Sequence, residues 1–225
     1  GRRSSGIGSA VGNATVTGGT STNYVNATVD GNADVSLNGV FDNSGELKGT
    51  ATITAGGTFN NTNTGVIDSP VTVGTHGDGV NSTFDNAGTV GAAGGDASTV
   101  MVAVSGGSGS YDAWDFHNTG TIYGSVTADD VSFSDNAGHI TGNVTVSEFA
   151  HFDNESSGVI DGTAWVDSTA ILNNYGTIGG VGIDGGTMYN PGTVGNVTVV
   201  RDDTNNANGY FYNNSADGTI AAGFG

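Results

Sequence analysis

The sequence predicts an all-β chain that folds as a β-solenoid, a stack of parallel β-strand coils with about 10 coils of 16–20 residues plus loop insertions. Three observations support this prediction. Apolar and polar residues alternate with a period of two, which is the period of extended backbone. One short motif recurs along the chain. Gly is abundant and Pro is scarce, with 41 Gly and 2 Pro among 225 residues.

The motif places an aromatic or apolar anchor, then Asn, Gly and an aliphatic residue, each two positions apart. Five copies are regular: Phe41-Asn43-Gly45-Leu47, Phe84-Asn86-Gly88-Val90, Phe116-Asn118-Gly120-Ile122, Leu172-Asn174-Gly176-Ile178 and Met188-Asn190-Gly192-Val194. Four copies carry small insertions: Phe59-Asn61 with Gly65-Ile67, Phe133 with Asn136-Gly138-Ile140, Phe152-Asn154 with Gly158-Ile160, and Tyr212-Asn214 with Gly218-Ile220. The shortest anchor spacings suit one solenoid coil per motif better than a hairpin sandwich or a propeller blade.

The insertions keep the inward and outward faces of the chain consistent. Those after Phe59, Phe152 and Tyr212 add two residues each, whereas a one-residue slip would turn the apolar set outward. Phe133 and the segment after Ile178 break the alternation, and we interpret both as β-bulges.

Inward Asn and Gly mark the corners of each coil. Gly allows a close approach to another backbone, and Asn tolerates left-handed backbone and can hydrogen-bond to its equivalent in the next coil. We therefore predict a corner ladder of Asn43, Asn61, Asn86, Asn118, Asn154, Asn174 and Asn190.

The domain organisation follows from where the motif occurs. Residues 1–10 are expected to form a flexible lead-in, and residues 11–225 one solenoid domain. Within it, residues 11–40 lack the motif and are predicted as irregular N-terminal coils or a cap, while residues 41–225 form the repeat coils.

Charge and composition exclude several classes of partner. The net charge is −18, from 22 acidic residues against 4 Lys and Arg. Such a chain repels phosphate backbones, so we expect no nucleic acid as a partner. No apolar run approaches the roughly 20 residues that span a bilayer, so no membrane insertion by this segment is expected.

The extended motif F-x-N-x-G-x-[ILV]-x-G-x-V-x-V, from Phe41 onward, resembles the passenger domains of bacterial autotransporter adhesins and, more loosely, haemagglutinin-type exoproteins. The resemblance implies a right-handed parallel β-helix on the extracellular surface of a Gram-negative bacterium. It also implies adhesion or self-association, as in aggregation, biofilm formation and virulence. The implied partners are a host-cell receptor, a glycan or another copy of the chain. A membrane barrel is expected to follow this segment in the full-length protein.

Parallel β-helices also include pectin-cleaving enzymes, which combine clustered Asp with Arg or Lys. Within the repeats the only cations are Lys48 and Arg201, which lie seven anchors apart. The His residues, His76, His117, His139 and His151, show no metal-ligand spacing. We therefore predict a non-enzymatic chain with no catalytic residues.

We expect no cofactor, with calcium as the one candidate ion. Residues 179–184, which end in Asp184, match the start of a calcium-binding G-G-x-G-x-D repeat, but only once. Together with Asp202 and Asp203, Asp184 is a candidate calcium ligand.

Candidate ligand-binding residues are aromatic or acidic and lie in a loop or at outward positions. Three long excursions are predicted, at 74–83, 91–115 and 200–211. The middle one contains Tyr111, Asp112, Trp114 and Asp115, which either contact a sugar or protein or fold back over the solenoid. Outward alternation exposes Tyr123, Trp165 and Tyr175, which suggest an interaction face.

Three functions remain open from the sequence. The leading hypothesis is an adhesin passenger without catalysis, which mediates adhesion or self-association. The alternatives are a structural stalk or extracellular matrix filament, and a polysaccharide-active lyase or hydrolase built on a β-helix.

Overall fold

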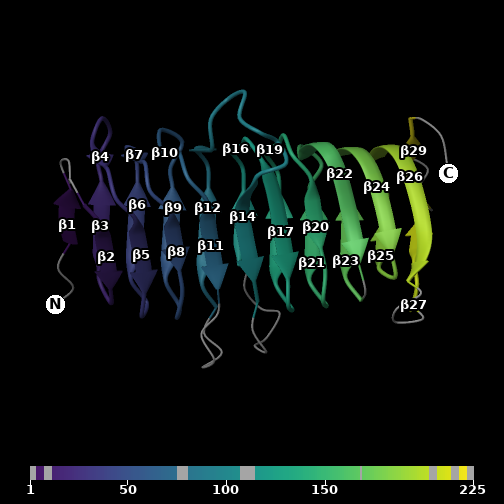
Figure 1. Ribbon diagram of the computed structural model, residues 1–225, viewed down its shortest axis with the longest axis horizontal. Helices are drawn as coiled ribbons and strands as arrows, with labels where there is room; N and C mark the ends of the chain where they lie inside the picture. The colour runs from purple at the N-terminus through teal and green to yellow at the C-terminus, as the bar shows by residue number, and fades with distance from the viewer. Residues whose placement is uncertain are drawn as a thin grey trace.

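The computed structural model describes residues 4–7, 12–74, 81–106, 115–167, 169–202, 207–213 and 218–221. β-Strand is the only regular secondary structure in these described residues. The strands stack in parallel along the long axis of the molecule, from β1 (Ser4–Ile7) to β29 (Thr219–Ile220) (Figure 1). The predicted β-solenoid is therefore confirmed, with about nine turns.

One strand of each coil belongs to a sheet that we call the anchor sheet, because it carries the anchor and the Asn of the motif. Its described strands are β1, β3 (Thr20–Asn23), β6 (Val40–Asn43), β9 (Thr58–Asn61), β12 (Thr83–Asn86), β15 (Phe116–Asn118), β18 (Phe133–Asn136), β21 (His151–Asn154), β23 (Ile171–Asn174), β25 (Thr187–Tyr189) and β28 (Tyr210–Tyr212).

The rest of each coil belongs to a second sheet, which bends around the remaining two sides. A short strand follows each anchor strand: β4 (Thr28–Val29), β7 (Glu46–Leu47), β10 (Val66–Ile67), β13 (Thr89–Val90), β16 (Thr121–Ile122), β19 (His139–Ile140) and β29. A longer strand completes the coil: β2 (Ala14–Thr17), β5 (Ala33–Ser36), β8 (Ala51–Ile53), β11 (Val71–Gly74), β14 (Val100–Ser105), β17 (Ser125–Asp129) and β20 (Val144–Val146).

In the last coils the short and long strands merge into one. These continuous strands are β22 (Val159–Asp167), β24 (Thr177–Asp184) and β26 (Thr193–Asp202), and β27 (Ala207–Asn208) pairs antiparallel with the end of β26. The register between β22 and β24 shifts after Ile160. The irregularity predicted near Ile178 is therefore present, because Ile178 is the residue paired with Ile160 where the shift begins.

The interior consists of columns of identical or similar side chains, one from each coil. Phe41, Phe59, Phe84 and Phe116 form an aromatic column with ring centroids 5.0, 5.8 and 5.9 Å apart. A second column, on the short strands and the start of β22, contains Leu47, Ile67, Val90, Ile122, Ile140 and Ile160, all fully buried. Each coil therefore stabilises its neighbours, because its apolar side chains pack against those of the adjacent coils in one continuous core.

The corner ladder of Asn side chains exists and is longer than predicted. Each Nδ2 donates to the Oδ1 of the next coil at 2.7–2.8 Å, in one direction along the whole ladder. Its described members are Asn23, Asn43, Asn61, Asn86, Asn118, Asn136, Asn154, Asn174, Asn190 and Asn213. The motif Gly lies beside this ladder; at Gly120, for example, a Cβ would collide with the carbonyl of Gly88.

Two motif copies are corrected by the register. Phe133 is not at a bulge: β18 pairs without a shift, Ser134 takes the inward anchor position, and Phe133 packs on the outer face against His151. In the last coil the anchor is Phe211 and the ladder residue is Asn213, one position earlier than predicted. At Phe133–Ser134 and at Phe211–Tyr212, two neighbouring residues compete for the inward anchor position, and the alternation in the sequence selected the wrong one of the two.

The coils also extend upstream of residue 41. Strand β3 pairs in register with β6, with Ser21 opposite Phe41 and Asn23 opposite Asn43. Strand β1, inside the expected lead-in, pairs with β3. The part of the chain that the structure describes contains no helix long and apolar enough to cross a membrane.

Candidate functional site

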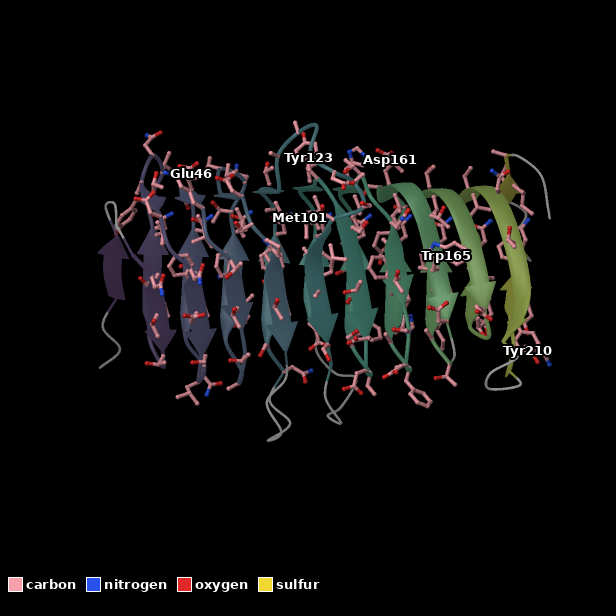
Figure 2. The ribbon with its side chains drawn as sticks, viewed as in Figure 1. Glu46, Met101, Tyr123, Asp161, Trp165 and Tyr210 are labelled. Carbon is pink, nitrogen blue, oxygen red and sulfur yellow. The ribbon has the colours of Figure 1, made fainter. Side chains whose placement is uncertain are left out.

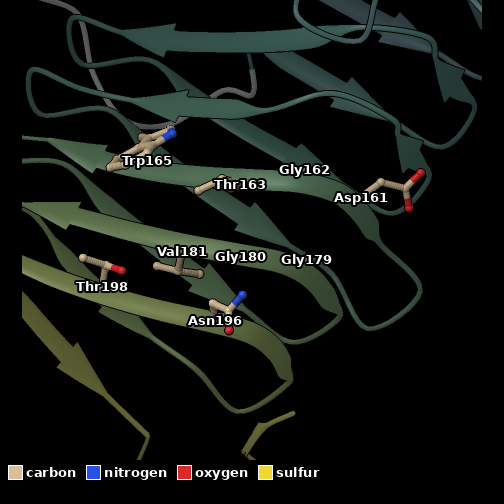
Figure 3. Close-up of a pocket in the computed structure, with 9 residues that line it drawn as sticks. All are labelled: Asp161, Gly162, Thr163, Trp165, Gly179, Gly180, Val181, Asn196 and Thr198. Carbon is tan, nitrogen blue, oxygen red and sulfur yellow. The ribbon is translucent and has the colours of Figure 1, made fainter. Parts of the chain in front are cut away.

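The candidate site lies on the outer face of the second sheet, across the continuous strands β22, β24 and β26. Residues at alternate positions of each strand face outward. On β22 these are Thr163 and Trp165, and on β26 they are Asn196 and Thr198 (Figure 3). The strand between them, β24, has Gly180 and Gly182 at the corresponding positions. The missing side chains leave a furrow one strand wide.

Trp165 fills one end of this furrow. A Cβ added at Gly182 would collide with Cε3 and Cζ3 of Trp165, so the indole ring lies over the Gly182 backbone. Gly182 is consequently buried, while Trp165 remains 43% exposed. The ring is thus supported from below by the neighbouring strand and open to solvent on its other side.

The remaining part of the furrow is an open trough with a volume of about 310 Å³. Gly179 and Gly180 form its floor, Thr163 and Asn196 flank it, and Trp165 closes one end. Among the described residues, no hydrogen bond engages the side chains of Thr163 and Asn196. The hydroxyl and the amide are therefore free to meet a ligand lying over Gly180.

The opposite end of the trough carries a negative charge. Asp161 is exposed, and its Oδ2 lies 2.8 Å from Nε2 of His139 in the preceding coil. Figure 3 shows Asp161 at the end of the trough away from Trp165. No Lys or Arg occurs among the residues that line the trough.

The three outward aromatic residues predicted from the sequence do not share a face. Trp165 is the one that lies in the trough. Tyr123 follows the short strand β16 and is only half-buried, and Tyr175 is exposed at the Asn corner between the two sheets. Figure 2 shows Tyr123 near the edge of the second sheet, apart from Trp165 on its broad face.

Of the four candidates predicted in the long loop, Asp115 lies within the described residues, whereas Tyr111, Asp112 and Trp114 lie outside them. Asp115 is 3% exposed, and its Oδ2 accepts a hydrogen bond of 2.9 Å from the backbone N–H of Phe133. Its Oδ1 is buried without a partner in the described part of the chain. Burial raises the pKa of Asp115 to about 6.

The candidate calcium ligands do not converge in the described residues. Asp184 is half-buried on the outer side of β24, next to Asp167 on β22. Asp202 ends β26, and Asp203 lies outside the described residues. In the ranges that the structure describes, no three His, Asp or Glu side chains are grouped so that they could hold a metal ion. The glycines of the calcium-like match instead form the floor of the trough and the support of Trp165.

A second polar feature follows the outer face of the anchor sheet. Asp85, His117 and Asp135 face outward at equivalent positions of consecutive coils. Nδ1 of His117 lies 2.6 and 2.7 Å from the two carboxylate oxygens of Asp135. Burial raises the pKa of both Asp85 and Asp135. Nearby, Nδ2 of Asn173 donates to Asp153 and to His151.

The C-terminal end of the anchor sheet carries a row of tyrosines that the sequence analysis did not identify. Tyr189 and Tyr212 stack at 5.0 Å, and Tyr210 lies 6.2 Å from Tyr212, with ring planes within 12° in both pairs. All three are exposed by 37–47%. The displaced anchor of the last coil hid this row, because Tyr212 was expected to face inward.

The trough contains residues that sequence reasoning also missed, namely Thr163, Gly180, Gly182, Asn196 and Thr198. The signal was present as two outward glycines in the strand after an outward Trp.

Comparisons with protein-family models, curated proteins and solved structures find no match to this chain.

Proposed function

We propose that this chain is a non-catalytic adhesin domain, displayed outside a bacterial cell, which binds other surfaces through the outer faces of its solenoid. The observation that carries the proposal is the open trough in which Gly182 supports an exposed Trp165. An exposed Trp held in a fixed orientation provides binding energy at low entropic cost, because it is ordered before the ligand arrives.

The architecture supports this role. In a solenoid each coil packs only on its neighbours, so a long surface can be presented without changing the interior. Here the inward columns are uniform, whereas the outward positions vary from coil to coil among Thr, Asp, His, Tyr and Trp. Variation on the outside over a regular interior is what a binding scaffold requires.

Adhesion of coated beads tests the proposal. Beads that carry the domain are expected to be retained on epithelial cells or on mucin-coated glass well above beads that carry an inert acidic protein. Retention equal to that control on every surface would contradict the proposal and favour the stalk alternative. Cleavage of polygalacturonate, assayed with and without calcium, would instead favour the polysaccharide-active alternative.

Self-association is a second candidate, favoured by the row of Tyr189, Tyr210 and Tyr212. Exposed aromatic side chains that lie together are common at protein interfaces. Sedimentation velocity is expected to show concentration-dependent association that is lost when all three are changed to Ser. Tyr24→Ser, which alters a 56% exposed tyrosine elsewhere, is the matched control. A monomer at all concentrations would exclude this mode.

A further inference from the structure

We propose that the trough beside Trp165 binds a neutral polysaccharide, with one pyranose stacked on the exposed face of the indole and the next pyranose lying in the trough over Gly180. This inference rests on the proposed binding function and specifies its ligand. It requires three properties of the site: an accessible aromatic face, polar groups at the distance of the ring edges, and a charge that rejects anionic sugars.

The aromatic face is available because of Gly182. The indole lies over the Gly182 backbone, so one face is covered by the sheet and the other is directed to solvent. Pyranoses with equatorial hydroxyls present an apolar surface of C–H groups, and such a surface packs well on a flat aromatic ring. A Trp standing upright on the sheet would offer mainly its edge.

The polar groups flank the floor of the trough. Thr163 and Asn196 lie on the strands either side of Gly180, and adjacent strands are about 4.7–4.9 Å apart. The pyranose next to the stacked one, lying over Gly180, would therefore have its edge hydroxyls directed towards both side chains. Because neither side chain is engaged with another described residue, both can exchange water for sugar hydroxyls without breaking an internal hydrogen bond.

The charge of the site selects neutral sugars. Asp161 lies at one end of the trough, and the lining contains no Lys or Arg to receive a carboxylate or sulfate. The chain as a whole carries a net charge of −18. A uronic acid would therefore lose its hydration and meet a like charge, whereas a neutral pyranose would not.

Calorimetric titration with defined hexasaccharides tests the inference. Cellohexaose or chitohexaose is expected to bind with one site per chain, whereas hexagalacturonate of the same length is not. Trp165→Ala is expected to weaken binding about 30-fold or more, as for a Trp hot spot. Trp165→Phe keeps an aromatic ring at this position and should retain most of the affinity that Trp165→Ala loses. Thr163→Ala combined with Asn196→Ala should weaken binding about 5–10-fold.

Matched controls separate the trough from the rest of the surface. Gly180→Val places a side chain on the trough floor and should abolish binding. Gly74→Val makes the same change on the outer side of β11, where a Cβ would make only an ordinary 3.9 Å contact with Cγ2 of Thr54, and should leave the affinity unchanged. Tyr24→Ala removes an aromatic residue that is more exposed than Trp165, at 56% against 43%, and should also be neutral. Thermal unfolding checks that each variant remains folded.

Each outcome has a definite meaning. Binding of the neutral hexasaccharides that survives both Trp165→Ala and Gly180→Val would overturn the assignment of the trough. Equal or tighter binding of hexagalacturonate would overturn the ligand class. Coated beads that adhere to cells although neither neutral hexasaccharide binds would contradict this inference and leave the adhesin function standing. If both adhesion and sugar binding are absent, the proposed function fails.

Discussion

The coils around the Phe column hold their aromatic side chains inside the solenoid, whereas the coils formed by β22, β24 and β26 carry most of theirs on the outer surface. From Phe41 to Phe116 the anchors are buried aromatic rings, and the outward positions between them are mostly Asp, Asn and His. From β22 onward the fully buried anchors are Leu172 and Met188, and the last anchor, Phe211, is partly buried, whereas Trp165 and the tyrosine row are exposed. Toward the C-terminal end, aromatic side chains therefore lie more often on the surface than in the interior columns.

This difference separates stability from binding. A buried ring contributes the free energy of removing its surface from water and of packing against the next ring. An exposed ring contributes little to stability, and its apolar surface becomes useful only when a ligand covers it. The strand structure changes at the same place, because the short and long strands merge into continuous strands that form a broader surface.

The largest expected effect is on stability, at the Phe column. Phe84→Ala should lower the free energy of unfolding by about 3–5 kcal/mol, because it leaves a cavity between Phe59 and Phe116. Trp165→Ala should lower it by less than about 1 kcal/mol while removing sugar binding. Urea unfolding and calorimetric titration of both variants check the contrast. Similar stability losses for the two would refute the separation of roles.

The Asn ladder should give the next largest effect, with a strong dependence on position. Asn118→Ala leaves Nδ2 of Asn86 without its acceptor and Oδ1 of Asn136 without its donor. Each buried polar group left without a partner costs roughly 1–2 kcal/mol, so we expect the free energy of unfolding to fall by about 2–4 kcal/mol. Asn213→Ala, at the end of the ladder, deprives one neighbour and should cost about half as much. Equal costs at the two positions in urea unfolding would show that the ladder is not the cause.

Most of the interior could be predicted from the sequence, because it depends on alternation and repetition. The inward Phe, Asn, Gly and Ile positions follow a period of two, and a one-residue error is revealed by exposed apolar side chains. Prediction failed where two neighbouring residues competed for one inward position. At Phe133–Ser134 the coil length decided, since the ladder from Asn118 to Asn136 to Asn154 keeps spacings of 18 residues. At Phe211–Tyr212 both candidates are aromatic, and the strand pairing places Phe211 opposite Met188.

The turns before the anchor strands show a limit of local preference. Leu37, Val131 and Phe149 adopt positive φ, at 52°, 62° and 67°. Such values favour Gly or Asn, so residue type gave no signal for these turns. The stacked strands on either side determine the backbone there, at a local energetic cost.

The trough could be predicted only in part, because its residues come from three different strands. Trp165 could be identified as outward from the alternation alone. Its partners lie on the next two coils, and their alignment depends on the register shift between β22 and β24 after Ile160. The glycines at 180 and 182 resembled a calcium repeat in sequence, and only the pairing of strands shows that they make room for the ring.

A smaller effect is expected from Asp115, which is buried beside the Phe column. Its pKa is about 6 in the folded chain and near 3.8 when unfolded. The folded state therefore holds a proton that the unfolded state releases between these values, so stability falls as pH rises from about 4 to 6. Asp115→Asn should leave stability at pH 4 unchanged and raise it at pH 7.5 by about 2–3 kcal/mol. Unfolding at both pH values checks this, and an unchanged pH profile would contradict it.

The smallest expected effect lies at the first interruption of the Phe column. Ser134 occupies the anchor position between Phe116 and Phe152, and its buried Oγ has no hydrogen-bond partner among the described residues. Ser134→Ala removes an unsatisfied hydroxyl without changing the shape of the interior, and should stabilise the domain by about 1 kcal/mol. The control is Ser147→Ala, on the outer side of the same coil, which should have no effect. If urea unfolding shows that Ser134→Ala destabilises the domain, the hydroxyl must have a partner, such as a buried water, and the column is bridged there by a polar contact.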